Sequence, residues 1–138
     1  MTRRQIHITE FDKRRLEELI AVADQFGNKE RNDLSALAGE VQRAKTVTSN
    51  EIPPNVVTMN SKVRLRDMDS SEELMYTLTF PIDADVSIGA ISVLAPIGTA
   101  LLGYAEGDVI DWPVPDGVRH IRIEEVLYQP EAAGDFHL

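Results

Sequence analysis

Few side chains in this sequence are suited to covalent or metal chemistry, and their spacing matches no known catalytic or metal-binding arrangement. The chain has no cysteine, which excludes disulfides, thiolate zinc sites and cysteine nucleophiles. Its three histidines, His7, His120 and His137, are far apart, and none belongs to a zinc-binding H-x-x-x-H or H-E-x-x-H pattern. Ser92, Asp108 and His120 have the residue types of a hydrolytic triad, but no nucleophile-elbow pattern surrounds Ser92. We therefore expect no enzyme, no metal and no cofactor.

Acidic residues are the other candidates for a functional site. Asp24, Glu30 and Asp33 lie around the turn between two expected helices, and Asp83 and Asp85 lie in a loop before an apolar segment. Glu30 and Asp33 have the i, i+3 spacing that places two carboxylates on one helix face, if the second helix begins before Asp33. In the more common alternative, Asp33 is the N-cap of that helix.

The composition indicates a folded protein with an acidic surface. The chain has 138 residues, a formal net charge of −9, and 43% hydrophobic and 27% charged residues. These values are typical of a globular chain of one or two small domains with a single proper core. The acidic balance disfavours direct binding to nucleic acid and favours a basic protein partner. The apolar runs are too short for a membrane span and no apolar leader follows Met1, so we expect a cytoplasmic monomer.

Two helices are predicted in the first third of the chain, because apolar residues there recur at 3-4-3 spacing. These residues are Leu16, Leu19, Ala23 and Phe26, followed by Leu34, Leu37, Val41 and Ala44. Thr9 and Asp12 resemble a capping box at the start of the first helix, which would run to Phe26. The two helices would form an antiparallel hairpin, a short coiled coil, in a first domain of residues 1–49.

The remainder, residues 50–138, has the period-two alternation of strands and would form a second domain after a proline-containing linker at residues 46–54. Strands are predicted at residues 56–59, 61–66, 74–80, 109–114 and 118–128, with the fourth broken by its prolines. They would form a small antiparallel sheet with one short helix, so the fold class is α+β. The tail, residues 129–138, is expected to be loosely attached.

Residues 90–103 are the one long uncharged segment, with the sequence A-I-S-V-L-A-P-I-G-T-A-L-L-G. The pattern predicts a buried strand at residues 91–94 that breaks at Pro96 and continues as a short helix. Gly103 is the residue type expected just after a helix C-terminus. This segment would complete the core between the predicted strands.

Several motifs in this order resemble one known family. A helical hairpin precedes I-S-V-L-A-P-I-G-T-A-L-L-G, then G-D-V-I-D-W-P-V-P-D-G and I-R-I-E-E-V. This order resembles the Gre transcript-cleavage-factor superfamily over nearly the whole chain. The short hairpin and the terminal Y-Q-P-E-A-A-G-D-F-H-L are similar to its Rnk branch, the regulators of nucleoside diphosphate kinase. The resemblance implies an FKBP-like second domain that docks on RNA polymerase core beside the secondary channel.

The resemblance also implies a docking site. Gre-type factors contact a coiled coil of the largest polymerase subunit through an acidic loop and a Ser-Pro step before the short helix. The matching positions are Asp83 and Asp85 for the loop and Ala95-Pro96 for the step, where alanine replaces the serine. Ile91 and Ile97 would complete an apolar ridge beside the loop. Carboxylates next to such a ridge fit a basic protein surface.

The same family places two acids at the hairpin tip to hold a magnesium ion that activates water for RNA hydrolysis. Asp33 matches the first acid, but Ala36 occupies the place of the second, with Asp24 and Glu30 as nearby alternatives. The hairpin is also shorter than a Gre hairpin. We therefore expect a binding protein that competes with Gre factors and affects nucleoside diphosphate kinase indirectly. A transcript-cleavage factor is the alternative; a prolyl isomerase is disfavoured because aromatic residues are only 6% of the chain.

Overall fold

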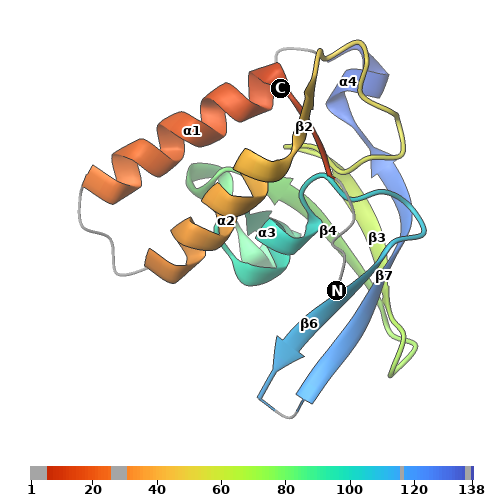
Figure 1. Ribbon diagram of the computed structural model, residues 1–138. Helices are drawn as coiled ribbons and strands as arrows, with labels where there is room; N and C mark the ends of the chain where they lie inside the picture. The colour runs from red at the N-terminus through yellow and green to blue at the C-terminus, as the bar shows by residue number, and fades with distance from the viewer. Residues whose placement is uncertain (1–5, 26–30, 116, 136–137) are drawn as a thin grey trace.

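Two helices, α1 (Glu10–Gln25) and α2 (Arg31–Arg43), form the N-terminal part of the protein in a computed structural model that describes residues 6–25, 31–115, 117–135 and 138 (Figure 1). Strand β1 (His7–Thr9) precedes them and β2 (Lys45–Val47) follows, and the two strands pair in parallel. The predicted linker therefore begins with a strand, because the chain leaving α2 pairs with the segment that enters α1.

The start of α1 follows the sequence pattern only in part. Thr9 caps the helix, since its Oγ1 accepts the N–H of Asp12 at 3.0 Å. The Asp12 carboxylate does not return the bond to Thr9; it is buried and accepts the backbone N–H of Met59 at 3.1 Å. The prediction for the second helix was wrong at its start. Helix α2 begins at Arg31, so Asp33 lies in its first turn and is not the N-cap.

The rest of the chain forms a five-stranded sheet with strand order β5-β4-β3-β7-β6. The strands are β3 (Lys62–Asp67), β4 (Glu73–Thr79), β5 (Ala90–Ser92), β6 (Val109–Val114) and β7 (Gly117–Tyr128). The short helices are η1 (Pro81–Asp83), η2 (Val86–Ile88), α3 (Pro96–Leu101) and α4 (Pro130–Ala133). Mixed helix and sheet confirm the α+β class, while the FKBP-like likeness and the coiled coil stay predictions.

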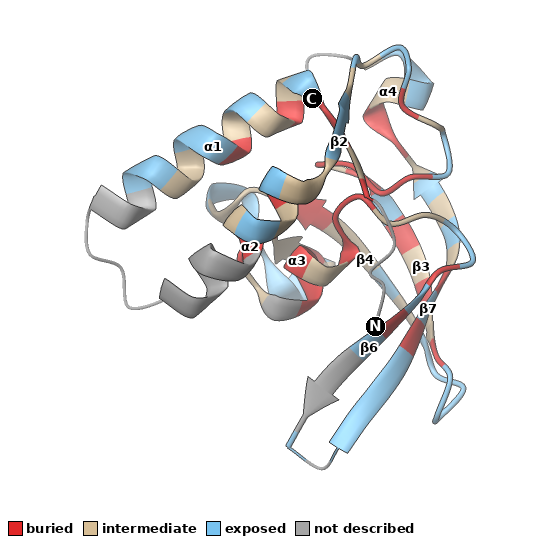
Figure 2. Ribbon diagram, in the orientation of Figure 1, coloured by how far each residue is buried: buried red, intermediate tan, exposed pale blue. Residues whose placement is uncertain are grey.

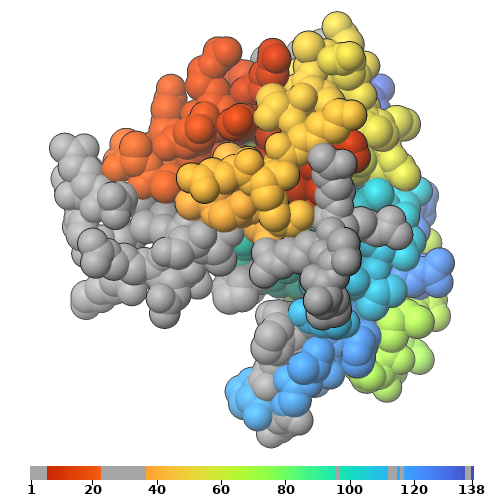
Figure 3. Space-filling view, in the orientation of Figure 1, coloured from red at the N-terminus to blue at the C-terminus, as the bar shows by residue number. Residues whose placement is uncertain are grey.

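Three details of the predicted sheet were wrong. Strand β5 pairs with β4 in parallel, so the sheet is mixed, because the loop between them carries the chain back before β5 begins. Residues 56–59 form no strand, and Val56 makes only an isolated bridge to Ala105. Pro113 does not break β6, which lies at the edge of the sheet, where a missing N–H removes no bond to a second neighbour. The hairpin of β6 and β7 projects from the body of the molecule (Figure 3).

The core lies between one face of the sheet and the helices (Figure 2). Alternate residues of β3 and β7 point into it, including Leu65 and Ile123. Leu16 of α1 and Leu37 of α2 belong to the same buried cluster, and α3 contacts both α2 and β6. The hairpin and the sheet thus share one core, and the division of the chain at residue 50 stays a prediction.

The C-terminal tail is held in place, contrary to the expectation from its composition. Gln129 is buried, and its Nε2 donates to the carbonyl oxygens of Pro53 at 2.7 Å and Val56 at 2.8 Å. At the other end of the tail, the carbonyl oxygen of Leu138 accepts from Arg15 at 2.8 Å and from Asn60. These polar contacts join segments far apart in sequence, so local patterns did not reveal them. Among the residues that the structure describes, no helix is long and apolar enough to span a membrane.

Candidate partner-binding site

The predicted acidic loop connects β4 to β5 and folds into two short 3₁₀ turns, η1 and η2. Pro81 begins η1, where its fixed φ is already helical. The N–H of Asp83 donates to the Phe80 carbonyl at 3.0 Å, and that of Ala84 donates to the Pro81 carbonyl at 3.2 Å. Local hydrogen bonds therefore set the shape of the loop.

Asp85 organises the second half of this loop. Its Oδ1 accepts the backbone N–H of Ser87 at 3.0 Å and the Ser87 hydroxyl at 2.6 Å, which makes Asp85 the N-cap of η2. Asp85 and Ala90 also exchange two backbone hydrogen bonds, of 2.8 and 3.0 Å. Gly89 closes the loop at φ 74°, and a Cβ there would lie 3.0 Å from the Met75 carbonyl oxygen. Asp85 thus has a structural role beside any role in binding.

Asp83 and Asp85 are both exposed, and neither forms an ion pair with any residue that the structure describes. Most acids on the open face of the sheet, by contrast, have an arginine partner. The loop therefore presents two uncompensated negative charges to solvent, as a surface for a basic partner requires.

The predicted apolar ridge is only partly accessible. Ile91 and Ala95 are half-buried, whereas Ile97 is 8% exposed and belongs to the core. Pro96 begins α3 directly after Ala95, which has no side-chain cap bond, and the Pro96 side chain lies outside the described residues. Ile97 can support the surface from below but has little area to offer a partner.

Helix α3 is packed closely against the end of β5, which holds the ridge in place. A Cβ on Gly98 would lie 2.1 Å from the carbonyl oxygen of Ser92, so only glycine permits this approach. Thr99 reinforces it, since its Oγ1 donates to the Val93 carbonyl at 2.6 Å. Gly103 ends the segment at φ 82°, as its position after the helix predicts.

The most exposed apolar residues of the loop were not predicted from the sequence. The side chains of Ile82, Val86 and Ile88 are 92%, 90% and 74% exposed. They alternate with the acids in the run I-D-A-D-V-S-I, at residues 82–88, which is too interrupted by Asp to form a buried strand. This interruption was the one sequence signal that these apolar residues are not part of a buried strand.

The candidate groups for other chemistry do not assemble into a site. Glu30 lies outside the described residues, as do the side chains of Asp24 and Asp33, so the predicted tip acids are not placed relative to one another. In the described part of the chain, no group of three or more His, Asp or Glu residues is arranged to hold a metal ion. His120 lies 3.4 Å from Asp69 and 3.6 Å from Asp111, while the Asp108 carboxylate accepts the N–H of Ala105 at 2.9 Å.

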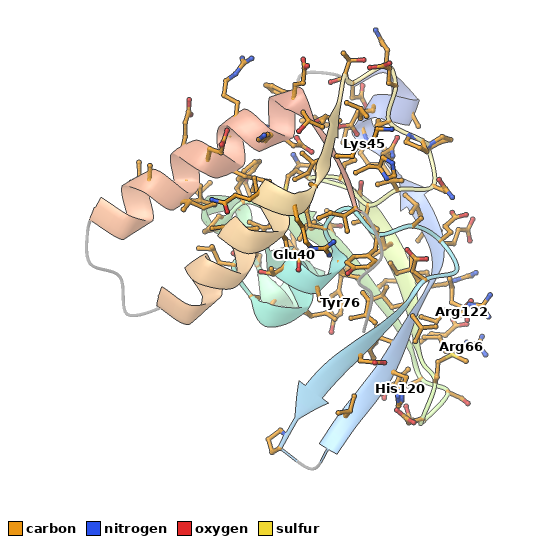
Figure 4. All side chains as sticks on the ribbon, in the orientation of Figure 1. Glu40, Lys45, Arg66, Tyr76, His120 and Arg122 are labelled. Carbon is orange, nitrogen blue, oxygen red and sulfur yellow. The ribbon has the colours of Figure 1, made fainter. Side chains whose placement is uncertain are left out.

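The arginines of the open sheet face are paired with acids. Figure 4 labels two of these arginines, Arg66 and Arg122. On this face the pairs are Arg64–Glu125 (3.3 Å), Arg66–Glu73 (3.0 Å), Arg66–Glu124 (2.8 Å) and Arg122–Glu124 (3.7 Å). Arg119 pairs with Asp67 at 2.7 Å on the opposite face, since both have the strand parity of residues that point into the core. Such exposed pairs contribute little to stability, but they balance the positive charge of the arginines on the open face. This face is therefore a poor candidate for binding nucleic acid.

A buried polar cluster connects the helical hairpin to the start of the loop. Asp12 is 1% exposed and pairs with Arg15, whose guanidinium lies 3.9 Å from the ring centre of Phe11 and 4.8 Å from that of Phe80. Burial raises the pKa of Asp12 to about 6, although the Met59 N–H and the Arg15 charge oppose this rise. Phe80 directly precedes η1, so the cluster fixes α1 against the base of the candidate site.

Comparison with known proteins agrees with this architecture. Residues 52–128 match the family model "Transcription elongation factor, GreA/GreB, C-term", and residues 4–47 match the model "Rnk N-terminus". The chain is 40% identical over 139 residues to the "Regulator of nucleoside diphosphate kinase" of Escherichia coli (strain K12), with 100% of both chains covered. The chain belongs to the Rnk branch of the GreA/GreB family.

The chain is also similar to a solved structure of the GreA/GreB family. A "Prokaryotic transcription elongation factor GreA/GreB from Nitrosomonas europaea" is 49% identical, with a TM-score of 0.74, and the match covers 90% of this chain and 100% of that one. The "Transcription elongation factor GreA" of Clostridium botulinum (strain Alaska E43 / Type E3) is 36% identical over 90 residues. That match covers 65% of this chain and 56% of the GreA chain, so this chain is similar to only part of that relative.

Proposed function

We propose that this protein is a transcription regulator that binds RNA polymerase core through the loop of residues 81–88. The observation that carries the proposal is the pair of exposed acids, Asp83 and Asp85, on a hydrogen-bonded loop in a chain whose relatives are transcription elongation factors. The net charge of −9 favours a basic partner surface and increases the rate of encounter with it.

In this proposal the partner surface is the coiled coil of the largest polymerase subunit, beside the secondary channel. The hairpin of α1 and α2 then lies over the channel mouth, and the protein competes with Gre factors for the same place. It acts by occupying the site and performs no catalysis. The relative in Escherichia coli is named a regulator of nucleoside diphosphate kinase; for this chain we propose that any such effect is indirect, through transcription.

The test is binding to purified RNA polymerase core by biolayer interferometry, with wild type beside Asp83→Asn/Asp85→Asn. Asparagine removes both charges but keeps a side-chain oxygen that can accept the Ser87 N–H, so the loop should keep its shape. We expect association to slow by about tenfold at low salt, with a smaller effect at high salt. The same binding and salt dependence in the variant would contradict the proposed role of the acids.

A matched control removes the same charge elsewhere. Glu18 of α1 and Glu72 of the β3–β4 turn are exposed, and Glu18→Gln/Glu72→Gln changes the net charge by the same amount. This control should bind almost as wild type does, because most of the net charge of −9 remains and neither glutamate lies in the proposed contact loop. Competition is checked by displacement of a labelled Gre factor from the core enzyme.

The alternative function, stimulation of transcript cleavage through Asp24, Glu30 and Asp33, is tested on a stalled elongation complex. We expect no shortening of the nascent RNA when this protein is added with magnesium. If the RNA shortens, and the shortening is lost when the three acids are changed to asparagine or glutamine, the cleavage function replaces the one proposed.

A further inference from the structure

Three apolar side chains stand out from the surface of the candidate loop. Ile82 is 92% exposed, Val86 is 90% exposed and Ile88 is 74% exposed, whereas Met75, the next most exposed large apolar residue of the described chain, is 54% exposed. Scattered half-exposed apolar residues are normal on a protein surface. Three apolar side chains that are largely exposed within seven residues are unusual, and such clusters mark sites of protein association.

The loop cannot hide these side chains by collapsing. Both of its halves are held by backbone bonds, with the Asp83 N–H on the Phe80 carbonyl and two bonds between Asp85 and Ala90. The cap that Asp85 makes to Ser87 fixes the turn that carries Val86 and Ile88. A surface held in its binding shape loses little conformational entropy when a partner binds.

We propose that Ile82, Val86 and Ile88 form an apolar anchor that enters an apolar patch at the centre of a basic surface on RNA polymerase. This inference rests on the proposed function and gives the acids and the apolar side chains separate parts in binding. The acids Asp83 and Asp85 speed encounter, while the anchor sets how long the complex lasts, because buried apolar contacts act mainly on dissociation.

Charge favours the polymerase over other possible partners of the anchor. Asp83 and Asp85 lie among the apolar residues and have no cationic partner in the described chain. A second copy of the loop would bring four carboxylates together, and an anionic lipid surface would repel the two that are present. A basic protein surface with an apolar centre satisfies both kinds of side chain.

The test variant is Ile82→Ala/Val86→Ala/Ile88→Ala, measured against RNA polymerase core at low and high salt. Each large apolar side chain that becomes buried contributes about tenfold to the equilibrium constant, so the triple variant should dissociate at least about 100-fold faster. Association and its salt dependence should change by less than about threefold, since the acids remain. The thermal midpoint should match wild type, because the three side chains make almost no contacts in the free protein.

The matched control, Val22→Ala/Val109→Ala/Val118→Ala, truncates exposed valines on α1, β6 and β7 and should keep wild-type dissociation. Ile82→Ala alone, at the most exposed position, provides a variant whose folding is least affected. If wild type binds the core enzyme and the loop variants dissociate at the wild-type rate, the proposed anchor is refuted and the proposed function stands. If wild type does not bind, the proposed function fails and the anchor with it. A loop-dependent dimer in sedimentation would also overturn the anchor, in favour of a second copy.

Discussion

The pH dependence of stability should be controlled in part by one buried carboxyl, and replacing Asp12 with asparagine isolates its effect. Asp12 is 1% exposed and accepts the Met59 N–H at 3.1 Å, so its environment combines burial with fixed hydrogen bonding. Arg15 pairs with it from the next turn of α1, and the charge of Glu131 opposes ionisation. Asparagine has nearly the same volume and can still accept from Met59, so the substitution leaves no cavity.

Burial raises the pKa of Asp12 from its ordinary value of 3.8 to about 6 in the folded protein. The folded state therefore holds the proton more tightly than the unfolded state does. This contribution to stability is fully present below pH 3.8 and is lost as the pH rises through about 6. At about 1.4 kcal/mol per pKa unit, the loss is about 3 kcal/mol by pH 8.

Urea unfolding of wild type and Asp12→Asn across about pH 4 to 8 measures this effect, because the difference between the two curves cancels the other titrating groups. The unfolding free energy of the variant relative to wild type should rise by about 2.5 kcal/mol over this range, mostly between pH 4 and pH 6. A difference that stays constant with pH would refute the burial argument. A variant that loses stability relative to wild type as pH rises would mean that the pair with Arg15 outweighs desolvation.

Two further substitutions test local features by the same urea measurement. Gly39→Ala in α2 should stabilise the protein by about 1 kcal/mol, because a Cβ there meets no atom within 4 Å and alanine is the better helix former; a loss of stability would show that this face of α2 is covered. Gln129→Ala should cost about 1–3 kcal/mol, because the carbonyl groups of Pro53 and Val56 lose their buried donor. Unchanged stability in that variant would mean that the tail is not held through Gln129.

The elements that sequence periodicity predicted are those whose pattern is local. Leu16, Leu37 and Val41 are buried, as their 3-4-3 spacing predicted, and alternation placed Leu65 and Ile123 in the core. The side chains of Ala23, Phe26 and Leu34 lie outside the described residues. Residues 90–103 were predicted in the correct order of strand, proline break, helix and glycine stop. Each of these depends on steric rules that act within a few residues.

Long-range contacts decided the remaining features. The burial of Asp12 depends on the Met59 N–H, and the docking of the tail depends on carbonyl groups near residue 53, both distant in sequence. The exposure of Ile82, Val86 and Ile88 was not predicted either, since isoleucine and valine are usually buried and the intervening Asp residues argue only against a buried strand. The acids of the candidate site were visible in the sequence because charge needs no fold to be recognised. The apolar side chains around them could be recognised as candidate contacts only from the folded loop, which leaves them exposed.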